Sequence, residues 1–131
     1  MSTGLTSLMV HPHKVHYPFG QPPIGVDVLW RCEAKSYSYV IDPDLDLYGV
    51  TKPVLEMRWH EVRHWTKTGA RLVCGQLVFL NKHLTQRQWA SRTPEEALES
   101  FKERRKRQIE ILTRQLERAQ YELKLTEEAI L

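Results

Sequence analysis

The sequence predicts an α+β fold in which a small antiparallel β-sheet is followed by a long C-terminal helix. Residues 54–66 alternate apolar and polar side chains, which is typical of a half-buried strand. A hairpin-turn pattern follows at residues 66–69. Residues 93–131 contain no helix breaker after Pro94, and their apolar side chains recur every three or four positions. The 131 residues suffice for a single domain with one modest core.

The first part of the chain is predicted to contain an extended arm and a β-rich part. Residues 1–25 are rich in proline and lack periodicity, so we expect an extended N-terminal arm. Residues 26–92 form the β-rich part. Its candidate strands lie at residues 26–31, 36–41, 54–66 and 70–81. The aspartates at residues 42–49 predict an acidic loop between the second and third strands.

Three residues mark local features of the third and fourth candidate strands. The alternation weakens after Glu61, which indicates a β-bulge. Gly69 suits a positive φ angle in the hairpin turn, and Gly75 is expected to interrupt the last strand.

The beginning of the helix is the clearest boundary in the sequence. Thr93 is a suitable N-cap, Pro94 suits the first helical position, and Thr93 with Glu96 forms a capping box. An unbroken helix over residues 93–131 would extend roughly 57 Å. That length exceeds the needs of a small domain, so we expect either an unmarked break, giving two helices, or a partner for the helix.

One side of the predicted helix carries an apolar stripe. It opens at Leu98 and Phe101 and is interrupted by Arg105. Its later members are Ile109, Leu112, Leu116, Ala119, Leu123, Thr126 and Ile130. The spacing fits packing on the chain's own sheet and a helix–helix seam equally well, and both can hold in successive turns. We predict a homo-oligomer, a dimer or a larger assembly, whose interface contains Ile109, Leu112, Leu116, Leu123 and Ile130.

The roughly opposite side carries an arginine stripe. Its members are Arg104, Arg107, Ile111, Arg114, Arg118, Tyr121 and Leu125. Arginines one turn apart can hold phosphates bidentately, and the tyrosine can stack on a base. The spacing also allows i,i+4 ion pairs of Glu103 with Arg107, of Glu110 with Arg114 and of Arg118 with Glu122. Periodicity alone favours such a solvated, ion-paired face.

Composition and motifs exclude several classes of protein. The chain has no apolar run long enough to span a membrane and no signal-peptide pattern. A net charge of +3 is small for non-specific DNA binding, so we expect no nucleic acid partner. Cys32 and Cys74 are expected to be free thiols. No spacing supports a catalytic constellation, a metal site or a cofactor motif, so we expect a protein that is not an enzyme.

Residues 87–101, which read Arg-Gln-Trp-Ala-Ser-Arg-Thr-Pro-Glu-Glu-Ala-Leu-Glu-Ser-Phe, and the basic cluster at 104–112 resemble a family of small phage and prophage proteins. The segment Trp-His-Glu-Val-Arg at 59–63, which precedes the predicted turn, is similar to that family's hairpin. The resemblance covers about residues 54–123. The family resembles the first type of Thoeris anti-defence sponges. Such proteins have an antiparallel sheet and long helices, and they form dimers and higher oligomers.

The resemblance implies sequestration of a cyclic ADP-ribose-type immune signal, with cyclic oligonucleotides as further ligands, and no chemical change to the ligand. It also implies that the protein is located in the cytoplasm of an infected bacterial host. The family's pocket combines an aromatic residue before the helix with two arginines one turn apart. Trp89 and the pair Arg114 and Arg118 match this description, and Arg104 and Arg107 are the next candidates. The family more usually has Phe or Tyr at the aromatic position, and residues 1–53 are unmatched.

Taken with the resemblance, the residues predict a phage counter-defence protein that captures a small cyclic nucleotide. Its candidate ligand-binding residues are Trp89, Arg104, Arg107, Arg114, Arg118 and Tyr121. Two alternatives use the same basic surface. One is an inhibitor that binds a host defence or nuclease complex directly, and the other is a small nucleic-acid-binding accessory protein.

Overall fold

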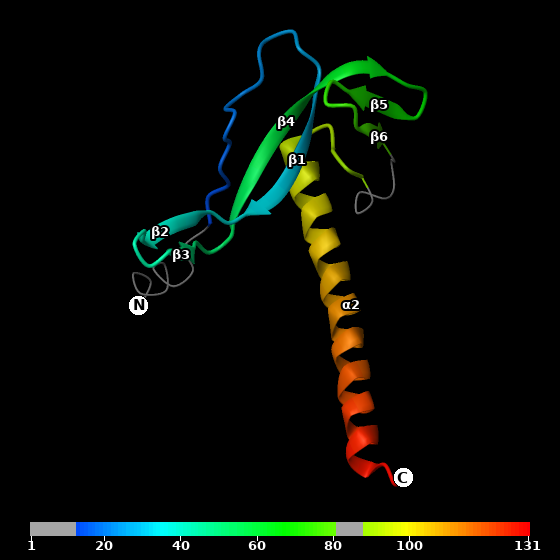
Figure 1. The fold of residues 1–131 in the computed structure, drawn as a ribbon. Helices are drawn as coiled ribbons and strands as arrows, with labels where there is room; N and C mark the ends of the chain where they lie inside the picture. The colour runs from blue at the N-terminus through cyan, green and yellow to red at the C-terminus, as the bar shows by residue number, and fades with distance from the viewer. Residues whose placement is uncertain (1–12, 81–87) are drawn as a thin grey trace, which may run out of the picture.

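A computed structural model describes residues 13–80 and 88–131 and has the predicted α+β architecture (Figure 1). The strands are β1 (Val28–Lys35), β2 (Ser38–Asp42), β3 (Leu47–Val50), β4 (Val54–Trp65), β5 (Gly69–Leu72) and β6 (Leu77–Phe79), and the helix is α2 (Pro94–Glu128). An antiparallel sheet has the order β1-β4-β5-β6, and β2 and β3 form a separate small sheet. None of the helices in the described part of the chain is long and apolar enough to cross a membrane.

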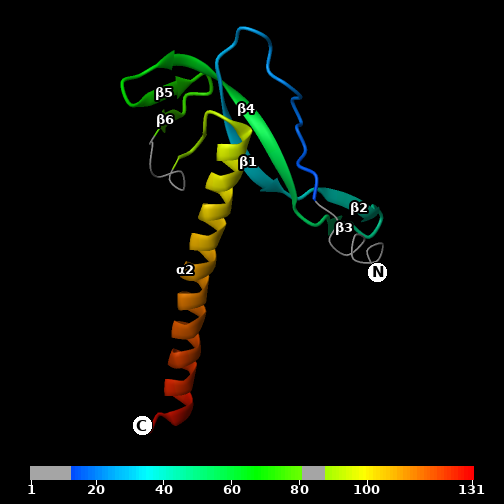
Figure 2. The same ribbon diagram turned by 180° about the vertical axis from the view of Figure 1, so that it is seen from behind.

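The long strand β4 organises the larger sheet by pairing with two different strands. Its first part pairs with β1, from Val54 opposite Lys35 to Glu61 opposite Val28. Its last part pairs with β5, and the register shifts between Val62 and His64. This shift confirms the bulge that the weakened alternation predicts. A bulge increases the local twist of a strand. Strands β5 and β6 pair at one end of β4, and the separate small sheet of β2 and β3 lies near its other end (Figures 1 and 2).

The acidic loop predicted at residues 42–49 is shorter than expected, because β3 begins at Leu47. The aspartates form the turn before β3. The backbone N–H of Asp44 donates to Oδ1 of Asp42 at 3.0 Å, and Asp46 has a φ of 53°. Aspartate tolerates this left-handed conformation and bonds its own backbone, so the acidic residues close a hairpin.

Gly69 and Gly75 have different roles in the β5–β6 region. Gly75 has a φ of 97° in the turn between β5 and β6, as expected from its interruption of the strand. The positive φ expected at Gly69 is wrong. A Cβ atom at Gly69 would lie 1.8 Å from the carbonyl oxygen of Val78 on β6. The position therefore requires glycine because two backbones approach closely there.

The core has two adjoining clusters on opposite faces of the β1–β4 pair. The first contains Leu29, Ala70, Leu72, Val78 and Ala90, with Val62, Leu80 and Trp89 packed against it. The second contains Trp30, Cys32, Met57, Ala97 and Phe101. Successive residues of β1 alternate between the faces, so Leu29 and Trp30 enter different clusters. The helix contributes to the second cluster only.

Helix α2 is continuous and leaves the sheet after its first turns (Figures 1 and 2). Thr93 caps it as predicted, accepting a hydrogen bond from the N–H of Glu96 at 3.2 Å. The side chains of α2 that are buried are those of Ala97, Ser100 and Phe101. Leu98, which was expected to open the packing stripe, is 38% exposed. The buried face lies between the apolar and arginine stripes, because at 100° per residue it is rotated by about 80° from the apolar stripe.

The described part of the N-terminal arm, residues 13–25, crosses the outer edge of β4. The N–H of His16 donates to the carbonyl of Leu55 at 2.9 Å, and the N–H of Met57 donates to the carbonyl of His16 at 2.8 Å. The aromatic side chains of the arm then pack edge-on against the sheet: Tyr17 on Trp30 at 5.9 Å and Phe19 on Trp59 at 6.1 Å between ring centroids. The arm thus covers part of the second core cluster.

Candidate functional site

Trp89 lies where the chain enters the helix, and strand β1 fixes its position. The next residues run beside β1 because Trp30 and Ser91 exchange backbone hydrogen bonds of 2.7 Å in both directions. The carbonyl of Trp89 accepts a 2.6 Å hydrogen bond from Nη1 of Arg31. The Arg31 guanidinium carbon lies 4.4 Å from the centroid of the indole ring, within the range of a cation–π contact. The ring of His60 approaches the indole edge-on at 5.0 Å.

Two helix arginines lie near the edge of β1, and the positive charge of Arg31 acts on one of them, Arg104. Nη2 of Arg104 donates to the carbonyl of Cys32 at 3.0 Å, at the open edge of β1. Arg104 Nε is buried and has no hydrogen-bond partner among the described residues. The guanidinium of Arg105 lies 4.5 Å from the ring of Phe101. We call Arg31, Arg104 and Arg105 the arginine cluster.

The electrostatics of the arginine cluster favour a bound anion. Burial lowers the pKa of the Arg104 guanidinium, and the positive charges of Arg31 and Arg105 lower it further. Burial also lowers the pKa of His60, with Arg31 acting in the same direction. Glu33 is the acidic group that acts on Arg104 and His60, and its Oε1 is already bonded to Nε of Arg31 at 2.8 Å. An anion would relieve the mutual repulsion of these cations.

Burial and the nearby arginines act in opposite directions on the pKa values of the neighbouring acid, Glu33, and the neighbouring thiol, Cys32. Although burial acts to raise it, the hydrogen bond from Arg31 lowers the pKa of Glu33 below its ordinary value. Burial raises the pKa of the Cys32 thiol, and Arg104 only partly opposes that effect. Cys32 is therefore a buried thiol of low reactivity, whereas Cys74 is exposed. Both are free, as the sequence predicts.

The structure brings only part of the predicted ligand-binding set together within one chain. Trp89 and Arg104 both lie at the base of the helix, where each contacts strand β1. Arg107, Arg114, Arg118 and Tyr121 lie further along α2, and all four are exposed. Because the helix rises 1.5 Å per residue, Arg114 is about 15 Å beyond Arg104. A site that combines Trp89 with Arg114 and Arg118 would need a second chain.

The ion pairs that the helix spacing allows form only in part. Nε of Arg118 lies 3.9 Å from Oε1 of Glu122, with side chains that are 82% and 63% exposed. Glu103 pairs with Lys106 at 3.3 Å rather than with Arg107. Over residues 13–80 and 88–131, neither Arg107 nor Arg114 has an ion-pair partner. The arginine stripe is therefore only weakly neutralised by its own glutamates.

Sequence reasoning did not identify Arg31 or Arg105 as site residues. Arg31 lies in a strand, 58 positions before its partner Trp89, so no local spacing connects them. In the sequence, Arg105 stands out only as an interruption of the apolar stripe. The signal that could have found Arg31 is its position among the apolar residues of a buried strand, where an unpaired charge is costly.

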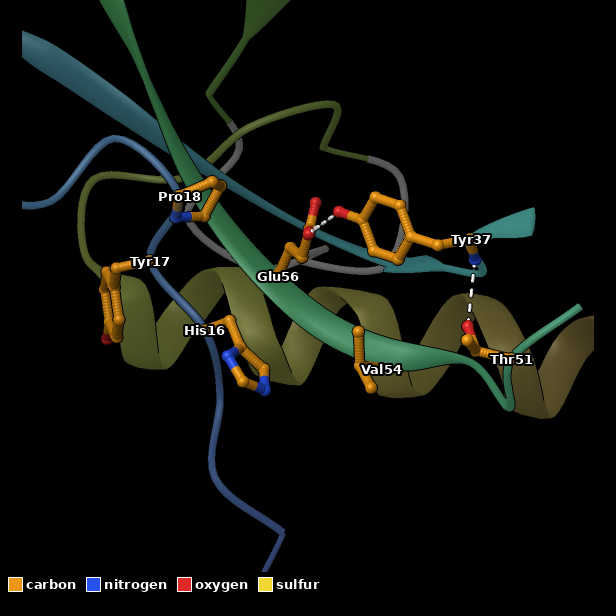
Figure 3. Close-up of a pocket in the computed structure, with 7 residues that line it drawn as sticks. All are labelled: His16, Tyr17, Pro18, Tyr37, Thr51, Val54 and Glu56. Atoms are coloured by element: carbon orange, nitrogen blue, oxygen red, sulfur yellow. Dashed lines mark hydrogen bonds between the residues drawn. The ribbon is translucent and has the colours of Figure 1, made fainter. Parts of the chain in front are cut away.

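A hollow lies between the arm, the start of β4 and the base of the small sheet, and Figure 3 shows its lining. Its volume is about 480 Å³, and it is lined by His16, Tyr17, Pro18, Tyr37, Thr51, Val54 and Glu56. The hydroxyl of Tyr37 donates to Oε2 of Glu56, and Arg58 donates to Oε1 at 2.7 Å. These two bonds, Tyr37 first, lower the pKa of Glu56. Both carboxylate oxygens are engaged, so we interpret this acid as structural.

No protein-family model matches this chain, and no curated protein and no solved structure matches it. Within residues 13–80 and 88–131, no three His, Cys, Asp or Glu side chains are grouped as a metal site.

Proposed function

We propose that this protein captures a small nucleotide-derived anion at the base of its helix and holds it without chemical change. The observation that carries the proposal is the arginine cluster at the edge of β1, where the positive charges of Arg31 and Arg105 act on Arg104 and the carboxylate of Glu33 is bonded to Arg31. Arginine is well suited to phosphate because its planar group forms two parallel hydrogen bonds. The half-buried indole adds an aromatic surface next to the cations.

The capacity of the site for phosphate lies mainly in Arg104 and Arg107. Arg31 already donates to Glu33 and to Trp89, so it positions the site more than it binds ligand. Arg104 uses Nη2 for the Cys32 carbonyl and retains a buried, unpartnered Nε. Arg107 follows one turn later and is exposed. An anion held between these two residues would satisfy the buried Nε and neutralise the local charge excess.

The resemblance to the phage family supports the class of ligand and the biological role. A protein of this kind would sequester a cyclic ADP-ribose-type signal, or a related cyclic nucleotide, as a homo-oligomer and so counter a bacterial defence. Enclosing a ligand of that size requires more surface than one helix base offers, and a second subunit can supply it. A ligand held at the helix base lies about 15 Å or more from Arg114, Arg118 and Tyr121 of the same chain, so these three residues lie outside the site proposed for one helix base.

Calorimetric titration with a cyclic ADP-ribose isomer tests this proposal. Replacing Arg107 with alanine, or Arg104 with lysine, should weaken binding about 10- to 150-fold through the loss of a bidentate contact. The matched control is Lys102→Ala, which removes an exposed positive charge from the same helix outside the arginine stripe. Its affinity should equal that of the wild type.

The ligand should also be recovered intact. Heating the complex to denature the protein should release the cyclic compound unchanged, as judged by chromatography. Recovery of linear ADP-ribose would show catalysis instead of capture. Equal affinities of the wild type and both arginine variants would remove the helix base as the site.

A second candidate function is direct inhibition of a host protein complex. The observation that favours it is the exposure of Ile111 and Leu125, at 43% and 48%, among the arginines of a protruding helix. Apolar residues within a basic surface are typical of protein interfaces. Replacing both with serine would abolish a protein complex formed through this face and leave nucleotide capture unchanged.

A further inference from the structure

Beyond its first turns, helix α2 has no partner within the described chain. From Arg105 onward every residue of α2 is exposed. The free helix, as we call residues 105–128, nevertheless keeps its apolar stripe. Ile109, Leu112, Leu116 and Leu123 are each between 52% and 62% exposed. Such a face in a long helix requires a partner, because an isolated helix is stabilised mainly by packing of its apolar side.

We infer that the free helix pairs in antiparallel orientation with the same segment of a second copy of this chain. The inference deepens the self-association part of the proposed function and does not depend on ligand capture. The apolar stripe alternates by three and four residues, as in a two-helix seam. Two further observations, on charge and on side-chain volume, determine the orientation.

The charges beside the seam favour the antiparallel arrangement. The flanking positions on one side of the seam are Lys106, Thr113, Gln120 and Glu127. An antiparallel pair places Lys106 opposite Glu127 of the second copy, and does so twice because the pair is symmetric. In the single chain Lys106 contacts Glu103 at 3.3 Å, an exposed ion pair that can exchange partners at little cost.

The parallel arrangement would place like charges together. It pairs Glu122 with Glu127 of the second copy on both sides of the seam, and it separates Lys106 from Glu127 by about 30 Å along the helix. Like charges at these flanking positions are unfavourable. The sequence thus contains attraction for one orientation and repulsion for the other.

Side-chain volume gives the same orientation. In the antiparallel register Leu116 faces Ala119 of the second copy, so each of the two central layers combines a large with a small residue, and Leu112 faces Leu123 in the next layer on either side. A parallel pair would instead stack Ala119 on Ala119 and leave space in the seam. Thr126 can enter the seam because its hydroxyl already donates to the Leu123 carbonyl at 2.6 Å.

The register also agrees with the position of the sheet. Pairing that centres between Glu117 and Arg118 overlaps residues 107–128 of both helices and places the two sheets at opposite ends, just past each other's helix tip. Each helix then ends, at Glu128, at the level of Arg107 of the other copy. Two equivalent arginine clusters result, and Arg104 of each lies about one turn beyond the tip of the other subunit's helix.

Charge reversal tests the orientation. Lys106→Glu and Glu127→Lys, each made alone, should weaken dimerisation about 10-fold. Static light scattering or analytical ultracentrifugation over a concentration series measures this change. The double variant should restore wild-type dimerisation, because the opposite charges meet again. In a parallel pair Glu127→Lys alone would instead strengthen the dimer, since it would remove the repulsion from Glu122.

Cross-linking gives an independent readout in a Cys74→Ser background, where the remaining Cys32 is fully buried. A mixture of Leu112→Cys and Leu123→Cys chains should cross-link with a short bismaleimide, and each variant alone should not. Cross-linking of each variant with itself would overturn the antiparallel orientation and leave self-association intact. A wild-type protein that is monomeric throughout the series would overturn self-association itself, whatever the result for ligand binding.

Discussion

At the scale of single residues, Gly69 is the position where one methyl group should have the largest effect on folding. Its missing Cβ would lie 1.8 Å from the Val78 carbonyl oxygen and 2.8 Å from the carbonyl carbon. Both atoms belong to the backbone of the neighbouring strand and cannot turn aside. We expect Gly69→Ala to lower the free energy of unfolding by about 2–3 kcal/mol, as in other overpacked sites. Urea denaturation at fixed protein concentration measures this change.

Gly49 provides a matched control on a different strand. A Cβ atom there would lie 2.4 Å from the tip of the Tyr39 ring, which is a side-chain contact. Tyr39 is 52% exposed and can rotate into solvent. Gly49→Ala should therefore change the stability by less than about 0.5 kcal/mol. If both variants lose similar stability, backbone contact at Gly69 is not the cause.

Single residues also show where sequence reasoning is least informative. The need for glycine at position 69 is visible in the sequence, but its cause is an approach of β6 that no local pattern reveals. Arg31 likewise acquires its role from Trp89 and Arg104, which are distant in sequence. The candidate aromatic residue and one helix arginine could be proposed from the sequence. Their strand partner could not, because it depends on the β1 edge.

At the scale of elements, the N-cap should account for a measurable part of the stability of α2. The Thr93 hydroxyl accepts the N–H of Glu96, an otherwise unpaired donor of the first turn. Thr93→Ala should lower the free energy of unfolding by about 1 kcal/mol. The loss should appear in global unfolding, because the capped turn carries Ala97 and Phe101 into the second core cluster.

Thr113 is the control for this effect. Its hydroxyl donates to the Ile109 carbonyl at 2.7 Å within the free helix, where no backbone group depends on it. Alanine has the higher helix propensity, so Thr113→Ala should be neutral or slightly stabilising. A comparable loss in both variants would mean that the Thr93 hydroxyl does not act as a cap.

The elements differ in how far they could be predicted. Helix α2 was predictable because its cap, its first-turn acids and its uninterrupted periodicity all agree. Strand β4 and its bulge were predictable because alternation and its loss are local signals. Strand β3 was missed because three aspartates outweighed the short segment Leu47–Val50. The packing face of α2 was predicted only in part: Phe101 is buried as the apolar stripe indicates, whereas Leu98 is 38% exposed and Ala97 is buried in its place.

At the scale of the whole molecule, a folded sheet region and a long helix share only a small contact (Figure 2). The sheet region contains both core clusters, and the helix adds Ala97 and Phe101 to one of them. The rest of the helix contributes apolar side chains that the described chain does not cover. Folding of the sheet and association of the helix should therefore be separable, and a substitution in the seam can disrupt one without the other.

Leu116→Glu tests this separation directly. A carboxylate in the dry centre of the seam should weaken self-association by about 100-fold or more, because burying a charge is costly. The fold of the sheet should persist, since Leu116 is 58% exposed in the single chain. Light scattering should show a mass near 15.5 kDa for the variant and a multiple of it for the wild type.

The control, Leu125→Glu, introduces the same charge at a similarly exposed leucine of the arginine stripe and should leave the assembly intact. Equal dissociation in both variants would mean that the assembly does not use the apolar stripe, and a wild-type mass of 15.5 kDa would exclude the assembly altogether.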